Sequence, residues 1–385
     1  MRTDDAADRL DTAEWAYAGR RYKMYSFPEE IQRDLKVLNR PDNWHVFLAW
    51  AADVIWIAGM VLGCVLVSPW LYPLAVVIIG ARQRGIAGIL HDCAHGIGIS
   101  DRRLQMMAGT VMSAYPIFQL HYAYKVSHVY THHPKLGNPE EDPDLRFFIE
   151  QGVYRKSTRR DYVRRVVLMP LTGRQTYAYL HYLVRNRSRV LSGKATPVPG
   201  ASTVRRGKRR LDACGFFAFW AVVIALAWSG GWLLGLVLFW IVPYLTTFQI
   251  ISWYIELSEH TPMIRDSNID LYMSRNRKGP WWEKLLTGVH GDSYHLEHHL
   301  DPRTPFYLRP KAREVRMRDA GYAAVDRQFG GLFTKGAEGQ PSAISVIIDY
   351  MVESRTIAEG GTSAEPKPPS RVNPSDASPR AKGAK

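Results

Sequence analysis

Cysteine is scarce in this sequence of 385 residues, and the cysteines that occur exclude a disulfide-stabilised fold. There are three, Cys64, Cys93 and Cys214, and two of them lie inside apolar runs. An odd and scattered set provides no disulfide framework and is typical of a reducing compartment or a membrane.

The amino-terminal segment lacks the apolar stretch of a cleavable signal peptide. Its first residues, MRTDDAADRLDTAEW, are rich in charge, and we interpret this as the absence of such a peptide. We therefore expect membrane insertion to depend on internal apolar segments. The sequence also shows no internal repeat.

Acidic residues are outnumbered by basic ones, and the formal net charge is +14. A basic protein can bind nucleic acid, an anionic membrane surface or acidic partner proteins. The basic residues flank apolar runs and form no recognisable nucleic-acid-binding module, so we expect no nucleic-acid partner.

Apolar residues are concentrated in four blocks, although the mean hydropathy of −0.21 is slightly negative. The blocks cover residues 46–67, 70–90, 213–228 and 232–255. Because a bilayer core of about 30 Å needs about 20 helical residues, we predict an all-α integral membrane fold with four transmembrane helices. Asp53, Arg82 and Arg84 interrupt the first two blocks. They should face a polar interior or extend to an interface.

The segment between the two pairs of blocks, residues 91–212, is rich in arginine. An excess of Lys and Arg marks the cytoplasmic side, and an even number of spans places both termini there. We divide the chain into a cytosolic lead-in at 1–44, a membrane domain at 45–352 and a tail at 353–385. The tail is rich in Pro, Ser, Ala and Lys, so we predict that it is disordered.

Eight of the thirteen histidines fall into three tight groups. They are His91 and His95, then His128, His132 and His133, and finally His295, His298 and His299. Spacings of three and four residues place side chains on one helical face, where two imidazoles can share a metal ion. All three groups should lie on the cytoplasmic side. Clustered imidazoles without a metal would repel one another when protonated, so we predict a metal site.

The number of histidines indicates two metal ions. One zinc ion takes four ligands, usually including Cys in structural sites, whereas eight or nine nitrogens suit two ions of higher coordination. Iron fits oxygen chemistry best, but ligand type alone leaves copper and zinc open. His260, just after the fourth block, is the ninth candidate ligand. Glu256, one turn earlier, is a candidate to supply a carboxylate or to hold a metal-bound water.

Acidic residues flank the histidine groups and are expected to accept hydrogen bonds from metal-bound imidazoles. They are Asp92, Asp142, Asp144, Asp292, Glu297 and Asp301. The remaining histidines lack a partner at metal-binding spacing, and we interpret them as structural. They are His45, His121, His181 and His290.

The motifs HDCAHG, HVYTHHP followed by NPEEDPDL, SEH and HLEHH occur in this order. They resemble the integral-membrane fatty acid desaturase/hydroxylase superfamily of three-histidine-box non-haem di-iron enzymes, over about residues 45–310. The resemblance implies a mushroom-shaped bundle of four membrane helices, with a cytosolic helical cap that holds two irons. It also implies the ligand set His91, His95, His128, His132, His133, His260, His295, His298 and His299.

Within this superfamily, HDCAHG and the DPDL sequence are most similar to acyl-lipid desaturases. The resemblance therefore implies an oxygen-dependent desaturase that introduces a C=C bond into a fatty acyl or similar lipid chain. The HxxxHH spacing is shared with alkane hydroxylases, so hydroxylation of an alkyl, fatty-acid or terpenoid chain is the alternative. A non-catalytic metal-binding membrane sensor and a zinc hydrolase of lipid amides or esters are hypotheses from other classes.

The same resemblance implies two iron ions that cycle between Fe2+ and Fe3+, with dioxygen as co-substrate. The sequence contains no fused cytochrome b5 or ferredoxin module. Electrons should therefore come from a separate carrier, such as ferredoxin or rubredoxin with its reductase. A basic cytoplasmic face would attract an acidic carrier of this kind.

Overall fold

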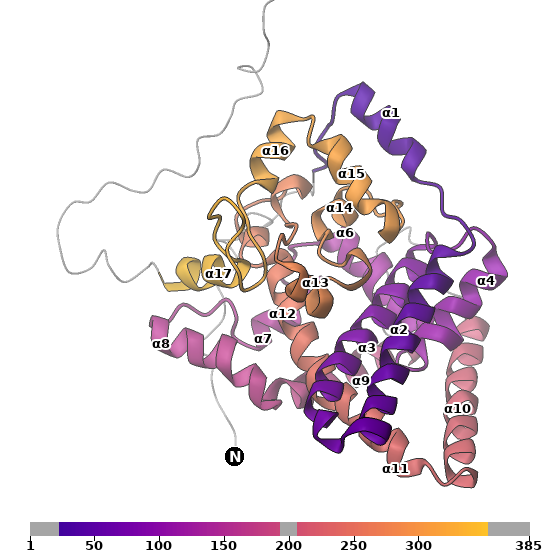
Figure 1. Cartoon of the computed structure of the whole chain (residues 1–385). Coiled ribbons are helices and arrows are strands. Elements are labelled where there is room, and N and C mark those ends of the chain that lie inside the picture. The colour runs from indigo at the N-terminus through magenta and orange to yellow at the C-terminus, as the bar shows by residue number, and fades with distance from the viewer. Residues whose placement is uncertain (1–22, 193–205, 353–385) are drawn as a thin grey trace, which may run out of the picture.

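The computed structural model describes residues 23–192 and 206–352, and within these ranges the chain is built from helices and loops (Figure 1). A single bridge between Lys23 and Ile269 is the extended pairing that these residues make. The all-α prediction is therefore confirmed. The tail at 353–385, predicted to be disordered, lies outside the described residues.

Four helical segments are long and apolar enough to cross a membrane. They cover His45–Val67, Pro69–His95, Gly207–Ser229 and Leu233–His260. The first is α2 (His45–Leu62) with η2 (Gly63–Val67), the second η3 (Pro69–Leu71) with α3 (Tyr72–His95), and the third lies in α10 (Arg206–Ser229). The fourth contains α11 (Leu233–Leu236), η8 (Val237–Ile241), η9 (Tyr244–Phe248) and α12 (Gln249–His260). Each contains one of the four predicted apolar blocks, except that the fourth block begins one residue earlier, at Trp232.

The outer faces of these helices are apolar and exposed. Ile55 and Leu66 on the first segment, and Phe217 and Trp228 on the third, are each more than two-thirds exposed. Exposed apolar surface of this extent is typical of contact with lipid. The segment that contains α3 differs, because 61% of its most apolar 18-residue stretch is buried. This helix therefore lies inside the bundle.

The charged residues of the first two segments were expected to face a polar interior or to extend to an interface. Asp53 and Arg82 face the protein interior. Arg82 lies 3.6 Å from Asp53 and donates to the carbonyl of Leu285. Asp53 is fully buried and also accepts a hydrogen bond of 2.7 Å from His290. Pairing of this kind offsets the cost of charge at membrane depth.

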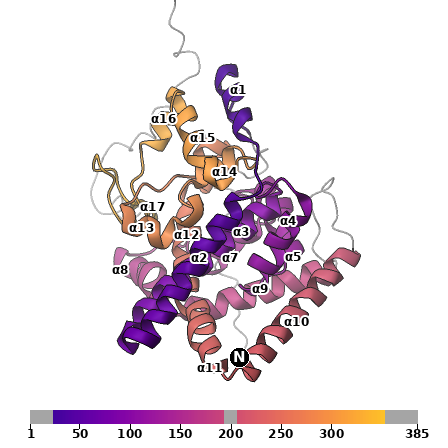
Figure 2. The ribbon, with the colours of Figure 1, turned by 45° about the vertical axis from the view of Figure 1, so that its right-hand side comes forward.

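Other helices make up the rest of the described residues. They are α1 (Glu29–Leu38), α4 (Arg102–Met107), η4 (Ala108–Ala114), α5 (His121–Ser127), η5 (His128–His132), α6 (His133–Lys135), α7 (Pro143–Glu150), α8 (Arg159–Tyr162), η6 (Val163–Leu168), η7 (Met169–Thr172), α9 (Arg174–Ser192), η10 (Met263–Arg265), η11 (Asp270–Tyr272), α13 (Trp281–Thr287), η12 (Val289–Gly291), α14 (His295–Leu300), η13 (Phe306–Leu308), α15 (Arg309–Arg316), α16 (Ala320–Asp326) and α17 (Ala343–Val352). In two views, α1, α14, α15 and α16 lie at one end of the molecule and the α10–α11 turn at the other (Figures 1 and 2).

The lead-in helix α1 shares a buried cluster with the element that carries the last histidine group. Its apolar residues Ile31, Leu35 and Leu38 recur every three or four positions and form one helical face. This face joins a buried cluster with Leu296 and Leu300 of α14. The face of α14 that carries Leu296 and Leu300 is thereby fixed to the rest of the protein.

Two of the long helical segments end at a predicted ligand. Helix α3 ends at His95, because Gly96 adopts a left-handed conformation with φ of +86° that would strain a larger residue. Helix α12 ends at His260, which is followed by extended backbone at Thr261. The two histidines therefore lie at helix ends, next to the remaining groups.

Candidate metal centre

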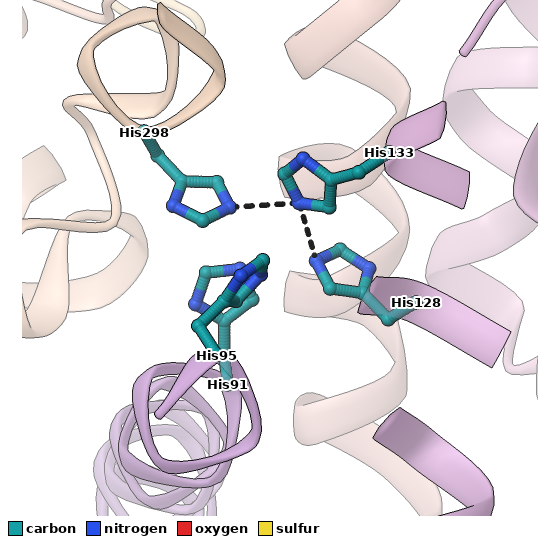
Figure 3. Close-up of side chains that lie close together, drawn as sticks. All are labelled: His91, His95, His128, His133 and His298. Atoms are coloured by element: carbon teal, nitrogen blue, oxygen red, sulfur yellow. Dashed lines mark hydrogen bonds between the residues drawn. The ribbon is translucent and has the colours of Figure 1, made fainter. Parts of the chain in front are cut away.

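The nine predicted histidines converge from distant parts of the chain into two adjacent groups. The first contains His91, His95, His128, His133 and His298 (Figure 3). The second contains His132, His260 and His299, and His295 joins it with its Nε2 atom 3.0 Å from that of His260. The groups are in contact, since the rings of His133 and His299 stack with centroids 4.5 Å apart.

The spacing of the nitrogen atoms fits metal coordination. Imidazole nitrogens bound about 2.1 Å from one metal ion lie about 3 Å apart when they are neighbours. The Nε2 atom of His133 lies 2.9 Å from that of His298 and 3.2 Å from that of His128 (Figure 3). His95 and His299 carry buried ring nitrogens with no hydrogen-bond partner in the described part of the chain. Because such atoms are costly to bury alone, the residues present fit two metal ions.

The second histidine motif is divided between the two groups by its backbone conformation. The segment η5 is a π-helix, in which residues five apart are brought to the same side. His128 and His133 therefore meet in the first group, whereas His132 belongs to the second and also lies close to His128 and Asp144. Residues four apart also lie close together, as the sequence analysis expected: His91 with His95 in the first group, and His128 with His132 beside Asp144.

Three of the six acidic residues expected to orient imidazoles do contact a predicted ligand. Asp142 accepts a hydrogen bond of 2.9 Å from Nδ1 of His132, and Asp92 accepts one of 3.0 Å from Nδ1 of His91. Asp144 lies 3.5 Å from Nδ1 of His132. A carboxylate on Nδ1 fixes the ring and leaves Nε2 available for a metal.

The other three acidic residues bind elsewhere. Asp292 pairs with Arg84 and Arg277, Glu297 with Arg316, and Asp301 with Arg303. Their nearness in sequence to the histidine motifs therefore reflects the packing of the surrounding helices.

Further contacts to the histidines were missed by the sequence analysis, among them those made by Glu259 and by Met273. Glu259 lies 3.2 Å from Nδ1 of His295, and the backbone carbonyl of Met273 accepts a hydrogen bond of 2.9 Å from Nδ1 of His260. Glu259 could have been identified from the sequence, because it lies next to His260. The carbonyl of Met273 could not, because every residue has a backbone carbonyl group.

Burial keeps most of these imidazoles neutral, which is the form that binds metal. It lowers the pKa of His128 to about 4, and it lowers the pKa of His298 well below the usual range, with neighbouring histidines adding to the shift. His132 behaves differently. Burial lowers its pKa too, but the carboxylates of Asp142 and Asp144 outweigh this and raise it to about 9.

These shifts predict that the metal-free protein loses stability when the pH falls from about 6.5 to about 4. Over this range an unfolded histidine with a pKa of about 6.5 binds a proton, but folded His128, with a pKa of about 4, does not. The unfolded state binds more protons, so acid favours it. The thermal unfolding midpoint of metal-free protein at a series of pH values measures this effect. Equal midpoints at pH 6.5 and pH 4.5 would contradict it.

The replacement Asp142→Asn should weaken metal binding without disturbing helix α7. Asp142 caps α7 by accepting from the backbone N–H groups of Asp144 and Leu145, and asparagine caps helices equally well. The lost charge no longer orients His132, so metal affinity should fall roughly 10- to 100-fold. Iron retained in competition with a chelator measures the loss. Asp301→Asn, which affects no histidine contact, should leave iron retention unchanged.

Comparisons with known proteins agree with this geometry. The family model described as "Fatty acid desaturase" matches residues 67–329. A dihydrorhizobitoxine desaturase from Bradyrhizobium elkanii is 44% identical over 331 residues, which cover 86% of this chain and 92% of that protein.

More distant relatives are plant enzymes. A chloroplastic omega-6 fatty acid desaturase from Spinacia oleracea is 21% identical, over 67% of this chain and 57% of the relative. One from Glycine max is 26% identical, over 67% of this chain and 60% of the relative. These matches support an oxidoreductase that carries out a desaturase-type reaction, and the chain belongs to the fatty acid desaturase family.

Proposed function

We propose that this chain is an oxygen-dependent desaturase that holds two iron ions with its nine clustered histidines. The observation that carries the proposal is the convergence of the nine imidazoles into two adjacent groups, with nitrogen atoms about as far apart as metal ligands. The family uses iron. When bound with dioxygen, the two ions supply the oxidising power needed to break unactivated C–H bonds.

Each iron is assigned to one group. His91, His95, His128, His133 and His298 would hold the first ion, and His132, His260, His295 and His299 the second. Four carboxylates would keep the imidazole rings oriented through the Nδ1 atoms of the rings. They belong to Asp92, Asp142, Asp144 and Glu259. Glu256 belongs to neither group, so we do not assign it as a ligand.

The substrate site is the cavity beside the two groups. His91, His128 and His132 line it together with apolar side chains such as Ile117 and Phe248. A saturated carbon chain in this cavity would lie next to both irons. The enclosing apolar side chains would exclude bulk water from the reacting carbons.

The identity of the carbon chain is a separate question from the reaction. The sequence suggested a fatty acyl or similar lipid chain, and the plant relatives are named for fatty acids. The relative of 44% identity is instead named for dihydrorhizobitoxine. We therefore include non-acyl substrates, and propose a separate electron donor such as ferredoxin or rubredoxin with its reductase.

The proposed orientation places the termini and the metal site in the cytoplasm. It is supported by the arginine-rich segment between the two pairs of apolar helices. Labelling of an introduced cysteine at an exposed position near the metal site, in intact cells and in lysed cells, tests this orientation. Labelling by an impermeant reagent in intact cells would contradict it.

The proposed reaction can be tested in aerobic cells that express the chain or its His298→Ala variant. Mass spectrometry of both the lipid and the aqueous extracts should reveal a product lacking two hydrogen atoms that the variant does not form. A product that gains one oxygen atom would favour hydroxylation. Turnover without oxygen or reductant, or a purified protein without iron, would overturn the proposal.

A further inference from the structure

The cavity beside the histidine groups contains more charge than its metal ligands require. Most of its charged side chains are paired with one another or with histidines. Arg84 pairs with Asp292, Asp142 and Asp144 with His132, Glu259 with His295, and Arg309 with Asp92. Two charged lining residues of opposite sign, Arg187 and Glu256, have no ion pair among the residues that the structure describes.

Arg187 is held in place with one guanidinium nitrogen left without a partner among the described residues. Its Nε and Nη2 atoms both donate to the side-chain oxygen of Gln119, at 3.0 and 2.8 Å. Gln119 is buried and neutral, so it fixes the guanidinium without neutralising it. The remaining Nη1 atom is buried and has no partner in the described ranges. A fixed guanidinium with a free edge is suited to a carboxylate.

Glu256 is the opposite charge in the same cavity. It lies on α12, one turn before His260, and its carboxylate accepts no hydrogen bond from any described residue. Glu256 is half-buried and lines the cavity, so its carboxylate can be reached by a ligand there. A cationic donor in the cavity would supply the partner that this carboxylate lacks.

Tyr124 and Tyr179 line the same cavity as the two charges. Burial raises the pKa of the Tyr179 phenol, the carboxylate of Glu256 raises it further, and Arg187 lowers it. Both charges also act on Tyr124, whose ring stacks on that of His128 with centroids 5.2 Å apart. The guanidinium lies 5.8 Å from the centre of the Tyr124 ring. Arg187 therefore lies beside the first histidine group, and Glu256 lies one helical turn from His260 of the second.

We propose that the substrate of this desaturase is a small zwitterion, whose carboxylate binds Arg187 and whose ammonium group binds Glu256. The inference rests on the proposed function only in taking this cavity as the substrate site. A neutral acyl chain would leave both charges unpaired, and a free fatty acid would leave Glu256 unpaired. A molecule with both charges satisfies both, and it holds its carbon chain beside the metal ligands.

The test is the binding of three matched probes to the iron-loaded protein in lipid nanodiscs. Norleucine carries both charges, hexanoate only the carboxylate and hexylamine only the ammonium group. Because hydrogen bonds between charged groups are the stronger ones, norleucine should bind at least about 10-fold more tightly than either single-charge probe in calorimetry.

Substitutions should remove the two contacts separately. Arg187→Gln should weaken norleucine and hexanoate by about 10- to 100-fold and leave hexylamine unchanged. Glu256→Gln should weaken norleucine and hexylamine and leave hexanoate unchanged. Arg187→Lys keeps the charge and should restore part of the hexanoate binding. The controls Arg185→Gln and Glu314→Gln change exposed residues and should have no effect.

The outcomes separate this inference from the proposed function. The proposed zwitterionic substrate would be overturned if the three probes bind equally or not at all. It would also be overturned if neither substitution changes the affinity for norleucine. Both results would count against it even if an acyl lipid loses two hydrogens in the cells. Charge-dependent norleucine binding, by a protein that dehydrogenates nothing in either extract, would support the binding site and overturn the reaction. Iron content measured for each variant shows whether it has folded around its metal site.

Discussion

Replacement of His133 by alanine should reduce the iron content to about half that of the unaltered protein and abolish oxygen-dependent turnover. The Nε2 atom of His133 lies 2.9 Å from that of His298 and 3.2 Å from that of His128. It therefore contacts two other members of the first group. Its removal opens this group, while the second group keeps all of its histidines. Iron analysis of the purified protein and product formation in cells measure the two effects.

The matched control is His181→Ala. This histidine is exposed on α9 and belongs to neither group, so its loss should change neither iron content nor turnover. Full iron content in His133→Ala would contradict the assignment of His133. Loss of both ions would show that the two groups fill cooperatively, through the contact between His133 and His299.

The replacement Glu297→Ala should destabilise the protein by about 3–5 kcal/mol, because it leaves a buried charge without a partner. Glu297 is fully buried within α14 and accepts hydrogen bonds from Arg316, Tyr322 and Asn276. Arg316 is itself only 1% exposed, so water cannot replace the lost carboxylate. Denaturant unfolding followed by tryptophan fluorescence measures the difference in the free energy of unfolding.

Glu314→Ala is the matched control for this prediction, because Glu314 is exposed on α15, the helix that carries Arg316. Its effect should be within about 0.5 kcal/mol. A double variant, Glu297→Leu with Arg316→Met, removes both buried charges and should recover much of the loss. Equal destabilisation by the double and single variants would show that the loss comes from packing and not from the uncompensated charge.

The four membrane-spanning candidates could be predicted because their signal is local. A run of about 20 apolar residues is sufficient to define such a helix, whatever the rest of the chain does. The third segment was predicted to begin at residue 213 but α10 begins at Arg206. Arginine forms helices readily, so the helix continues beyond the apolar run that marked it.

The candidate ligands were also visible in the sequence, because imidazoles at short spacing are rare enough to draw attention. The division of those ligands into two groups was not visible. It depends on the π-helical turn at His128–His132 and on the meeting of α3, α12 and α14, which come from distant parts of the chain. Hydrogen-bond partners such as the Met273 carbonyl likewise depend on tertiary contacts alone.

The sequence by itself therefore determined the fold class, the four apolar helices and the set of nine clustered histidines, since each is encoded by residue type at short spacing. Only the tertiary structure decided which imidazoles meet, which carboxylates orient them, and which charges in the cavity lack partners. Arg187 and Glu256 are 69 residues apart in the sequence, and no local pattern relates them. Their relation arises because α9 and α12 pack around the same cavity, where two opposite charges without an ion pair among the described residues indicate a ligand.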